Sequence, residues 1–285
     1  MTSSTTTESA AALLQQRRAE NFPVSLRVLP RTLRHDLIAV YDVVRVIDNL
    51  GDEAPGDRLA LLADFAADQH RAFAGGQPRT DVLRRLVPTI DRRNLSEQPL
   101  LDLIEANRTD QRTVRYASFE DLVGYCRLSA VPIGRLVLQI FGQPQPDLAA
   151  LSDDVCTALQ ILEHCQDVAE DYRRGRIYLP QQDLQAFGVA EYELEASSAG
   201  PRLRALITHE VDRCERLLDS GDELVGRLSG WAKLAIAGYL AGGRATVATI
   251  RRADGDVLAA VPKPSRRATV RYALRVLAGR SRPYR

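Results

Sequence analysis

Two pairs of aspartates lie far apart in this chain, and each pair sits inside an apolar segment with the spacing of an α-helix. The first pair is Asp48 and Asp52, and the second is Asp167 and Asp171. Residues four apart project from the same face of a helix, about one turn from each other. Each segment is therefore expected to form a helix that directs two carboxylates toward one point. Two such helices facing each other would form a Mg2+ site.

The residues around the aspartates favour this interpretation over an ordinary solvated acidic face. Tyr41 and Arg45 precede Asp48 on the same helical face, among valine and isoleucine residues that a solvated face does not need. Gln160 and Glu163 hold the corresponding positions before the second pair. Buried carboxylates without a partner are costly, and Mg2+ binds such oxygens while bridging them to substrate phosphates.

A basic and aromatic segment follows the second pair and ends at Pro180. Residues 172–180 read Tyr-Arg-Arg-Gly-Arg-Ile-Tyr-Leu-Pro and include Arg174 and Arg176. Arginine binds phosphate oxygens through paired, charge-assisted hydrogen bonds. Together with Arg45, these arginines predict a diphosphate that is held through the metal.

Composition excludes some other classes of protein. The chain has 285 residues, is 45% apolar and carries a net charge of +1, which argues against nucleic acid as the main partner. Its four cysteines show neither C-x-x-C pairing nor zinc-site spacing, so we interpret them as reduced packing residues of a cytoplasmic protein. They are Cys126, Cys156, Cys165 and Cys214.

Helical periodicity dominates the whole chain and predicts an all-α fold in a single domain, a helical bundle around a central cavity. Residues 1–9 are expected to be a disordered tail without the features of a signal peptide, 10–261 the helical domain, and 262–285 a basic C-terminal helix or tail. Residues 231–250 are expected to form a buried helix rather than a membrane span. The predicted helices cover residues 10–19, 30–50, 57–73, 80–90, 97–109, 119–141, 148–171, 201–218, 224–253 and 266–278.

These motifs, in this order, resemble those of the squalene and phytoene synthase family. The resemblance extends over residues 21–253 and includes Tyr41-x-x-x-Arg45-x-x-Asp48-x-x-x-Asp52, the Tyr125-Cys126 pair followed by a glycine, and the segment from Gln166 to Pro180. Within that family, residues 20–24 and 129–136 are most like the bacterial hydroxysqualene synthases.

The family resemblance implies an isoprenoid synthase fold, prenyl diphosphate substrates and Mg2+ between two aspartate-rich helices. It implies that the chain converts presqualene diphosphate and water to hydroxysqualene, in squalene and hopanoid biosynthesis, with functional coupling to a presqualene diphosphate synthase. The implied metal ligands are Asp48, Asp52, Glu163, Asp167 and Asp171. The implied catalytic residues are Tyr41, Arg45, Asp48, Asp52, Tyr125, Asp167 and Asp171. The implied substrate-binding residues are Arg18, Asn21, Tyr41, Arg45, Gln160, Arg174, Arg176, Tyr178 and Tyr239.

Some positions leave alternatives open. Tyr239 is as well explained by core packing as by lining a cavity, and we interpret His164 as a packing residue. Glu163 stands where many relatives have asparagine, and Val131 stands where hydroxysqualene synthases are expected to have asparagine. Either change would alter the surroundings of the carbocation that forms when diphosphate leaves the substrate. The alternatives in function are head-to-head condensation by a presqualene diphosphate, squalene or phytoene-type synthase, and an isoprenoid-binding helical protein without turnover.

The C-terminus is strongly basic. Residues 262–285 contain eight lysines and arginines and no acid, with Val270, Leu274 and Leu277 as a partial apolar stripe. This pattern predicts weak peripheral contact with a membrane, at the inner face of the cell membrane. The alternatives are a helix whose arginines reach back to the diphosphates and a simple solvated helix.

Overall fold

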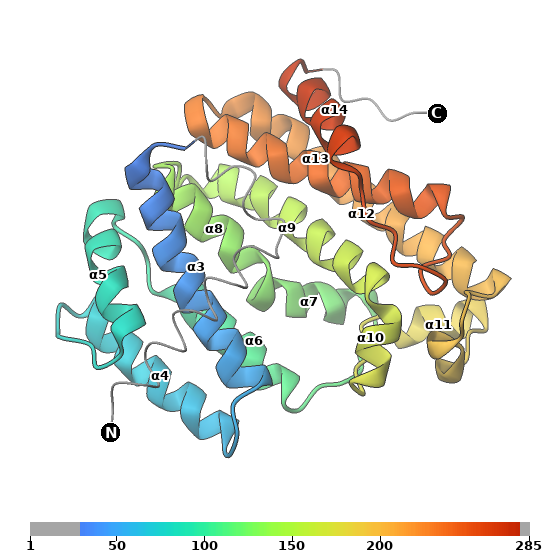
Figure 1. The fold of residues 1–285 in the computed structure, drawn as a ribbon, viewed down its shortest axis with the longest axis horizontal. Helices are drawn as coiled ribbons and strands as arrows, with labels where there is room; N and C mark the ends of the chain where they lie inside the picture. Colours follow the sequence, from blue (N-terminus) through green and yellow to red (C-terminus); the bar gives the residue numbers. More distant parts are fainter. Residues whose placement is uncertain (1–28, 280–285) are drawn as a thin grey trace.

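Helices form nearly all the regular structure of the computed structural model, which describes residues 29–279 (Figure 1). In that range the strand-like pairing is a single isolated bridge between Arg115 and Ile177. The predicted all-α class is confirmed. The helices are α3 (Arg31–Asp52), α4 (Arg58–Phe73), α5 (Asp81–Arg93), α6 (Gln98–Asp110), α7 (Phe119–Ser129), α8 (Val131–Ile140), α9 (Pro146–Gln166), α10 (Val168–Arg173), α11 (Gln181–Phe187), the 3-10 helix η1 (Glu191–Glu195), α12 (Pro201–Arg227), α13 (Gly230–Arg252) and α14 (Arg266–Leu277).

Local chemistry explains where several helices begin. Ser118 precedes α7 in a capping box, in which its hydroxyl accepts from the Asp121 amide and the Asp121 carboxylate accepts from the Ser118 amide. Asp57 and Ser265 cap α4 and α14 through their side chains. Prolines occupy the first turn of α6, α8, α9 and α12, where a missing N–H costs nothing.

Three predicted helices were wrong in their continuity. The helix predicted over 119–141 is broken at Ala130, just before Pro132, whose ring cannot continue a preceding helix. The helix predicted over 148–171 is broken at Asp167, which has φ −101° and ψ 15°. The predicted helix 201–218 extends to Arg227, and the helix predicted over 224–253 is broken at Leu228 and Ser229, between α12 and α13. α11 and η1 were not predicted because five to seven residues hold too few periodic positions.

The central helices pack closely enough to need a glycine. α9 packs along α12 and against α8, while α3 packs against α5 and α6 and α13 against α14. In Figure 1, α7 and α8 lie between α3 and α9. A Cβ on Gly134 of α8 would lie 2.5 Å from Cys156 Sγ and 2.6 Å from Ser152 Oγ on α9. The buried apolar side chains from Leu29 to Val276 form one core cluster.

Several predictions concern residues outside the described range. The N-terminal tail at 1–9, the helix at 10–19, and the substrate-binding residues Arg18 and Asn21 all precede residue 29. They stay predictions. All four cysteines are free, and Cys126, Cys165 and Cys214 are buried, as expected of packing residues. Within residues 29–279 no helix combines the length and the apolar character that crossing a bilayer requires.

Candidate active site

The last three turns of α3 carry the first group of predicted residues. Tyr41, Arg45, Asp48 and Asp52 lie on this helix, whose apolar face buries residues such as Val43 and Ile47. The Arg45 guanidinium lies 3.8 Å from the Asp48 carboxylate. Asp52 is the final residue of the helix, and half of its side chain is exposed. Its carboxylate therefore lies at the end of the helix, where groups from other segments can reach it.

The second aspartate pair is arranged differently from the prediction. Asp167 is the residue between α9 and α10, and Asp171 lies within α10. The Asp171 amide nevertheless donates to the Asp167 carbonyl at 2.8 Å, which is the helical pattern of bonding. The two residues thus keep the one-turn relation that the spacing predicted, although the helix is interrupted between α9 and α10.

The segment after α10 returns to the first aspartate pair. Gly175 adopts φ +82°, a conformation that favours glycine, and the chain turns there. Arg176 then donates from a guanidinium nitrogen to Asp52 Oδ1 at 3.0 Å. Arg174 behaves differently, because it pairs with Glu170 at 2.8 Å on an exposed surface. The Arg176–Asp52 ion pair joins two motifs that are 124 residues apart in the sequence.

Behind this ion pair lies a group of buried tyrosines. The rings of Tyr116, Tyr125 and Tyr178 have centroids 5.4 to 5.7 Å apart. Tyr125 Oη donates to Asp110 at 2.8 Å, and Tyr178 Oη lies 3.5 Å from the same carboxylate. Burial raises the pKa of the Tyr125 and Tyr178 hydroxyls, so both stay protonated and available as donors.

Asp110 and Tyr116 were missed by the sequence analysis. Asp110 is the last residue of α6, and Tyr116 lies in the connection from α6 to α7. Burial raises the pKa of Asp110, while the hydrogen bond from Tyr125 and the charge of Arg176 act in the opposite direction. Neither residue belongs to a periodic acidic motif, so no pattern in the sequence distinguished them from surface positions.

His164 was also missed as a site residue. It is buried, as expected of a packing histidine, but its ring stacks on Tyr178 with centroids 3.7 Å apart. Its Nδ1 lies 3.7 Å from Asp171 Oδ2, and its Nε2 lies 3.2 Å from the Gln160 amide nitrogen. His164 thereby connects the second aspartate pair to the tyrosines. Its position one turn before Asp167 was the available signal.

The carboxylates of the second motif have the chemistry of ligands for a divalent cation. Burial raises the pKa of Asp167, and the neighbouring carboxylates of Asp171 and Glu170 raise it further. Such a cluster of oxygen ligands with unfavourable mutual repulsion is stabilised by a divalent ion. Glu163 is exposed on α9, one turn before Asp167. Asp48, Asp52, Glu163, Asp167 and Asp171 are thus chemically suited to Mg2+, and their role as ligands stays a prediction.

An apolar cavity of about 210 Å³ lies between α8, α9, α12 and α13. Its walls include Ile133, Val137 and Leu159, and Tyr239 lines it from α13. Gln160 and Glu163 also line this cavity, on the side of α9 that leads to Asp167. The predicted central cavity is therefore present, with polar groups at the part of its wall nearest to the second aspartate motif.

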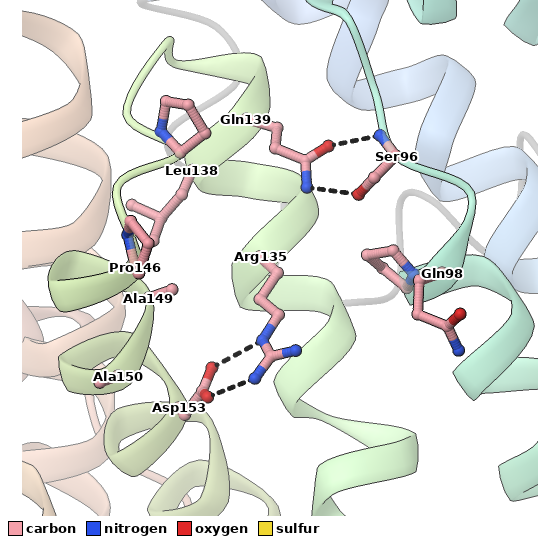
Figure 2. A pocket seen from close by; sticks show the side chains of 11 residues that line it. Ser96, Gln98, Arg135, Leu138, Gln139, Pro146, Ala149, Ala150 and Asp153 are labelled. Carbon is pink, nitrogen blue, oxygen red and sulfur yellow. Dashed lines mark hydrogen bonds and ion pairs between the residues drawn. The ribbon is translucent and has the colours of Figure 1, made fainter.

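A separate surface pocket of about 400 Å³ lies at the other end of α9 (Figure 2). Arg135 pairs there with Asp153 at 2.8 Å, and the Gln139 side chain bonds to both the amide and the hydroxyl of Ser96. These polar groups bond to one another, and none of the predicted site residues lines this pocket.

Comparison with known proteins finds relatives in one family. The sequence profile described as squalene/phytoene synthase matches residues 15–272. The chain is 31% identical to a hydroxysqualene synthase of Sinorhizobium fredii over 74% of this chain and 72% of that protein. It is 31% identical to a 15-cis-phytoene synthase of Synechococcus elongatus over 77% of this chain and 78% of that protein.

A solved structure shows the same fold at higher identity. The crystal structure of squalene synthase HpnC from Alicyclobacillus acidocaldarius is 42% identical in sequence, with a TM-score of 0.79 over 87% of this chain and 94% of that one. The fold is the all-α isoprenoid synthase fold. With a matching profile over most of its length and relatives above 30% identity, the chain belongs to the squalene/phytoene synthase family.

Proposed function

We propose that this enzyme converts presqualene diphosphate and water to hydroxysqualene and diphosphate, in squalene and hopanoid biosynthesis. The observation that carries the proposal is the Asp52–Arg176 ion pair, which joins the end of the first acidic motif to the segment that follows the second one. Gln160 and Glu163, which precede the second motif on α9, line an apolar cavity. Relatives named hydroxysqualene synthase suggest this reaction, although relatives named phytoene synthase are equally similar to the chain.

The metal of the proposed reaction is Mg2+, held by Asp48, Asp52, Asp167 and Asp171, with Glu163 as a further oxygen ligand. Mg2+ bound there would stabilise the negative charge of the departing diphosphate. Four of these acids belong to the two motifs that Arg176 joins. Burial raises the pKa of Asp167, and the negative charge of Asp171 and Glu170 raises it further.

The arginines of the site bind the same leaving group. Arg45 lies beside Asp48, and Arg176 lies beside Asp52, so both guanidinium groups can donate to phosphate oxygens near the acids. Cleavage of the carbon–oxygen bond transfers its electron pair to diphosphate and leaves a carbocation. Two cationic side chains next to the diphosphate make that separation of charge less costly.

The carbocation is then protected until water reacts with it. Tyr125 and Tyr178 offer ring faces, which attract positive charge, while their hydroxyls are oriented by Asp110. The apolar wall that includes Ile133 and Leu159 excludes other water molecules. The cyclopropylcarbinyl cation rearranges with opening of the three-membered ring. Bonding of one water oxygen to the rearranged cation, with loss of a proton, gives hydroxysqualene.

A second enzymatic function is the head-to-head condensation of two prenyl diphosphates, giving presqualene diphosphate, squalene or a phytoene-type product. The phytoene synthase of Synechococcus, 31% identical over 78% of its length, favours it. The same carboxylates and arginines would serve that reaction. Val131, which is buried at the start of α8, and Glu163 at the cavity are the positions that we expect to influence which reaction occurs.

A product assay separates these functions. Purified protein with Mg2+ is supplied either with presqualene diphosphate or with farnesyl diphosphate, and the extracted lipids are identified by mass spectrometry. Hydroxysqualene from presqualene diphosphate supports the proposal. Consumption of farnesyl diphosphate alone, to presqualene diphosphate, would support the condensing enzyme.

Two variants connect the assay to the site. Asp48→Ala should abolish product, whereas Asp91→Asn on the exposed surface of α5 should leave it unchanged. If neither substrate gives a product, both enzymatic functions are contradicted, and the isoprenoid-binding helical protein is the alternative that is left. Because presqualene diphosphate is itself a condensation product, we also propose coupling to a presqualene diphosphate synthase, which a mixed assay starting from farnesyl diphosphate would detect.

A further inference from the structure

The outer face of α14 combines large aliphatic side chains with arginines. Val270 is 58% exposed and Leu274 is 64% exposed, more than the other exposed valine and leucine side chains among residues 29–279. They lie one helical turn apart, and Arg266, Arg267 and Arg271 are exposed on the same side of the helix. The opposite side is anchored, since Val276 is buried in the core. The exposed face is thus held in place rather than loosely attached.

The charge of this region has one sign. After Asp256 the chain contains no acid as far as residue 285, while residues 263–275 include one lysine and four arginines. A helix with arginines beside exposed aliphatic residues has the composition of helices that lie in the interface of a lipid bilayer. Anionic lipid headgroups provide the complementary negative charge.

The connection that leads into α14 passes next to the second aspartate motif. The Gln166 side-chain amide donates to the carbonyl of Pro262, and Gln166 directly precedes Asp167. A surface that binds α14 would therefore lie close to the site.

We propose that the outer face of α14 docks onto an anionic phospholipid bilayer. Val270 and Leu274 enter the interface, and Arg266, Arg267 and Arg271 contact the lipid phosphates. A second copy of the chain is a poorer occupant, because pairing two α14 helices through this face brings arginine against arginine. Lipid contact near the site would also suit a hydrocarbon product, a point that rests on the proposed function, whereas the docking itself does not.

Vesicle sedimentation tests this proposal. The full chain is mixed with vesicles of phosphatidylcholine, or of phosphatidylcholine and phosphatidylglycerol in equal amounts, and the bound fraction is measured at low and high salt. We expect binding to the anionic vesicles that weakens with salt. No binding, or equal binding to both compositions, would overturn the proposal, as would a salt-insensitive dimer seen by light scattering in place of lipid binding.

Variants of exposed residues identify the face. Arg267→Glu/Arg271→Glu should weaken partitioning more than about tenfold, since each basic residue near the surface contributes about 1 kcal/mol. Val270→Ser/Leu274→Ser should weaken it with the charge unchanged. Arg31→Glu/Arg85→Glu changes two exposed arginines at the starts of α3 and α5 and makes the same change in net charge. An equal loss with this control pair would show a general effect of charge and would contradict the assignment to α14.

Discussion

At the scale of single residues, Arg174 and Arg176 had similar predicted roles but have different surroundings, because the chain turns at Gly175 between them. Arg174 pairs with Glu170 where both side chains are more than half exposed. Arg176 has only a fifth of its side chain exposed and pairs with Asp52. Exposed ion pairs contribute little free energy, whereas hydrogen bonds to charged groups in protected places contribute more.

This difference predicts unequal effects of the same substitution. Arg176→Met should lower kcat/KM for presqualene diphosphate by about 10-fold to 100-fold, the equivalent of about 1.5–3 kcal/mol. Arg174→Met should lower it by less than about threefold. Steady-state kinetics of both variants, with circular dichroism to confirm folding, would measure this. Equal losses would mean that Arg174 moves onto the diphosphate when substrate binds.

Gly134 is a second residue whose role depends on a close approach. A methyl group there would lie within 2.6 Å of side-chain atoms of Ser152 and Cys156. Gly134→Ala should therefore lower the free energy of unfolding by about 1–3 kcal/mol through overpacking, offset by about 1 kcal/mol of helix propensity. Thermal unfolding should show a lower Tm. Gly242→Ala on α13, where nothing lies within 4 Å of the added atom, should raise the Tm instead.

A double substitution tests the cause of the Gly134 effect. Replacing Cys156 by alanine removes one of the two atoms that the added methyl group meets. Gly134→Ala/Cys156→Ala should then be more stable than the two single changes predict when added, because neighbouring substitutions couple. Strict additivity would mean that the backbone of α8, rather than Cys156, absorbs the change.

At the scale of helices, length and periodicity decide what could be predicted. α3, α12 and α13 each have more than twenty residues, and their apolar periodicity predicted them as helices. The break at Asp167 was not predictable in this way, because apolar positions continue in helical register on both sides of it. Likewise, Asp52 and Asp167 were predicted from their spacing, whereas Asp110 and Tyr116 enter the site only through tertiary packing of the α6–α7 connection.

A buried titratable group, where α11 packs on α12, makes stability depend on pH. Asp183, His209 and Glu210 have ligand atoms within 4.8 Å of one another, and Arg213 donates to both Asp183 and Glu210 at 2.5 and 2.8 Å. Arg213 thus supplies positive charge to this cluster. Burial raises the pKa of Glu210 to about 8, against the opposing effect of Arg213.

The raised pKa predicts the direction of the pH effect. Between about pH 4.5 and pH 8 the folded chain keeps the Glu210 proton that the unfolded chain loses. The folded state therefore binds more protons, and the free energy of unfolding falls as pH rises through this window. Glu210→Gln should remove this contribution, which is on the order of 2 kcal/mol. Denaturant titrations at pH 5 and pH 8 would measure the difference; identical pH dependence in both proteins would contradict it.

At the scale of the whole molecule, the candidate site depends on segments from both halves of the chain. α3 provides Asp48 and Asp52, while α9, α10 and the following turn provide Asp167, Asp171 and Arg176. In Figure 1 these elements lie on different sides of α7. A ligand that bridges them binds the folded state and not the unfolded one, and such a ligand raises the free energy of unfolding by an amount set by its concentration relative to Kd.

Mg2+ and inorganic diphosphate should therefore stabilise the protein together far more than either does alone. Diphosphate alone meets the repulsion of the carboxylates, and Mg2+ alone lacks the contacts of Arg45 and Arg176 with phosphate. At about 100 times Kd the gain is about 2.7 kcal/mol, which raises the Tm by about 5 °C or more. Differential scanning fluorimetry would measure this shift. Asp48→Ala should abolish the joint effect while Asp91→Asn retains it. An undiminished shift in Asp48→Ala would place the diphosphate elsewhere, because the first aspartate pair would then contribute nothing to holding it.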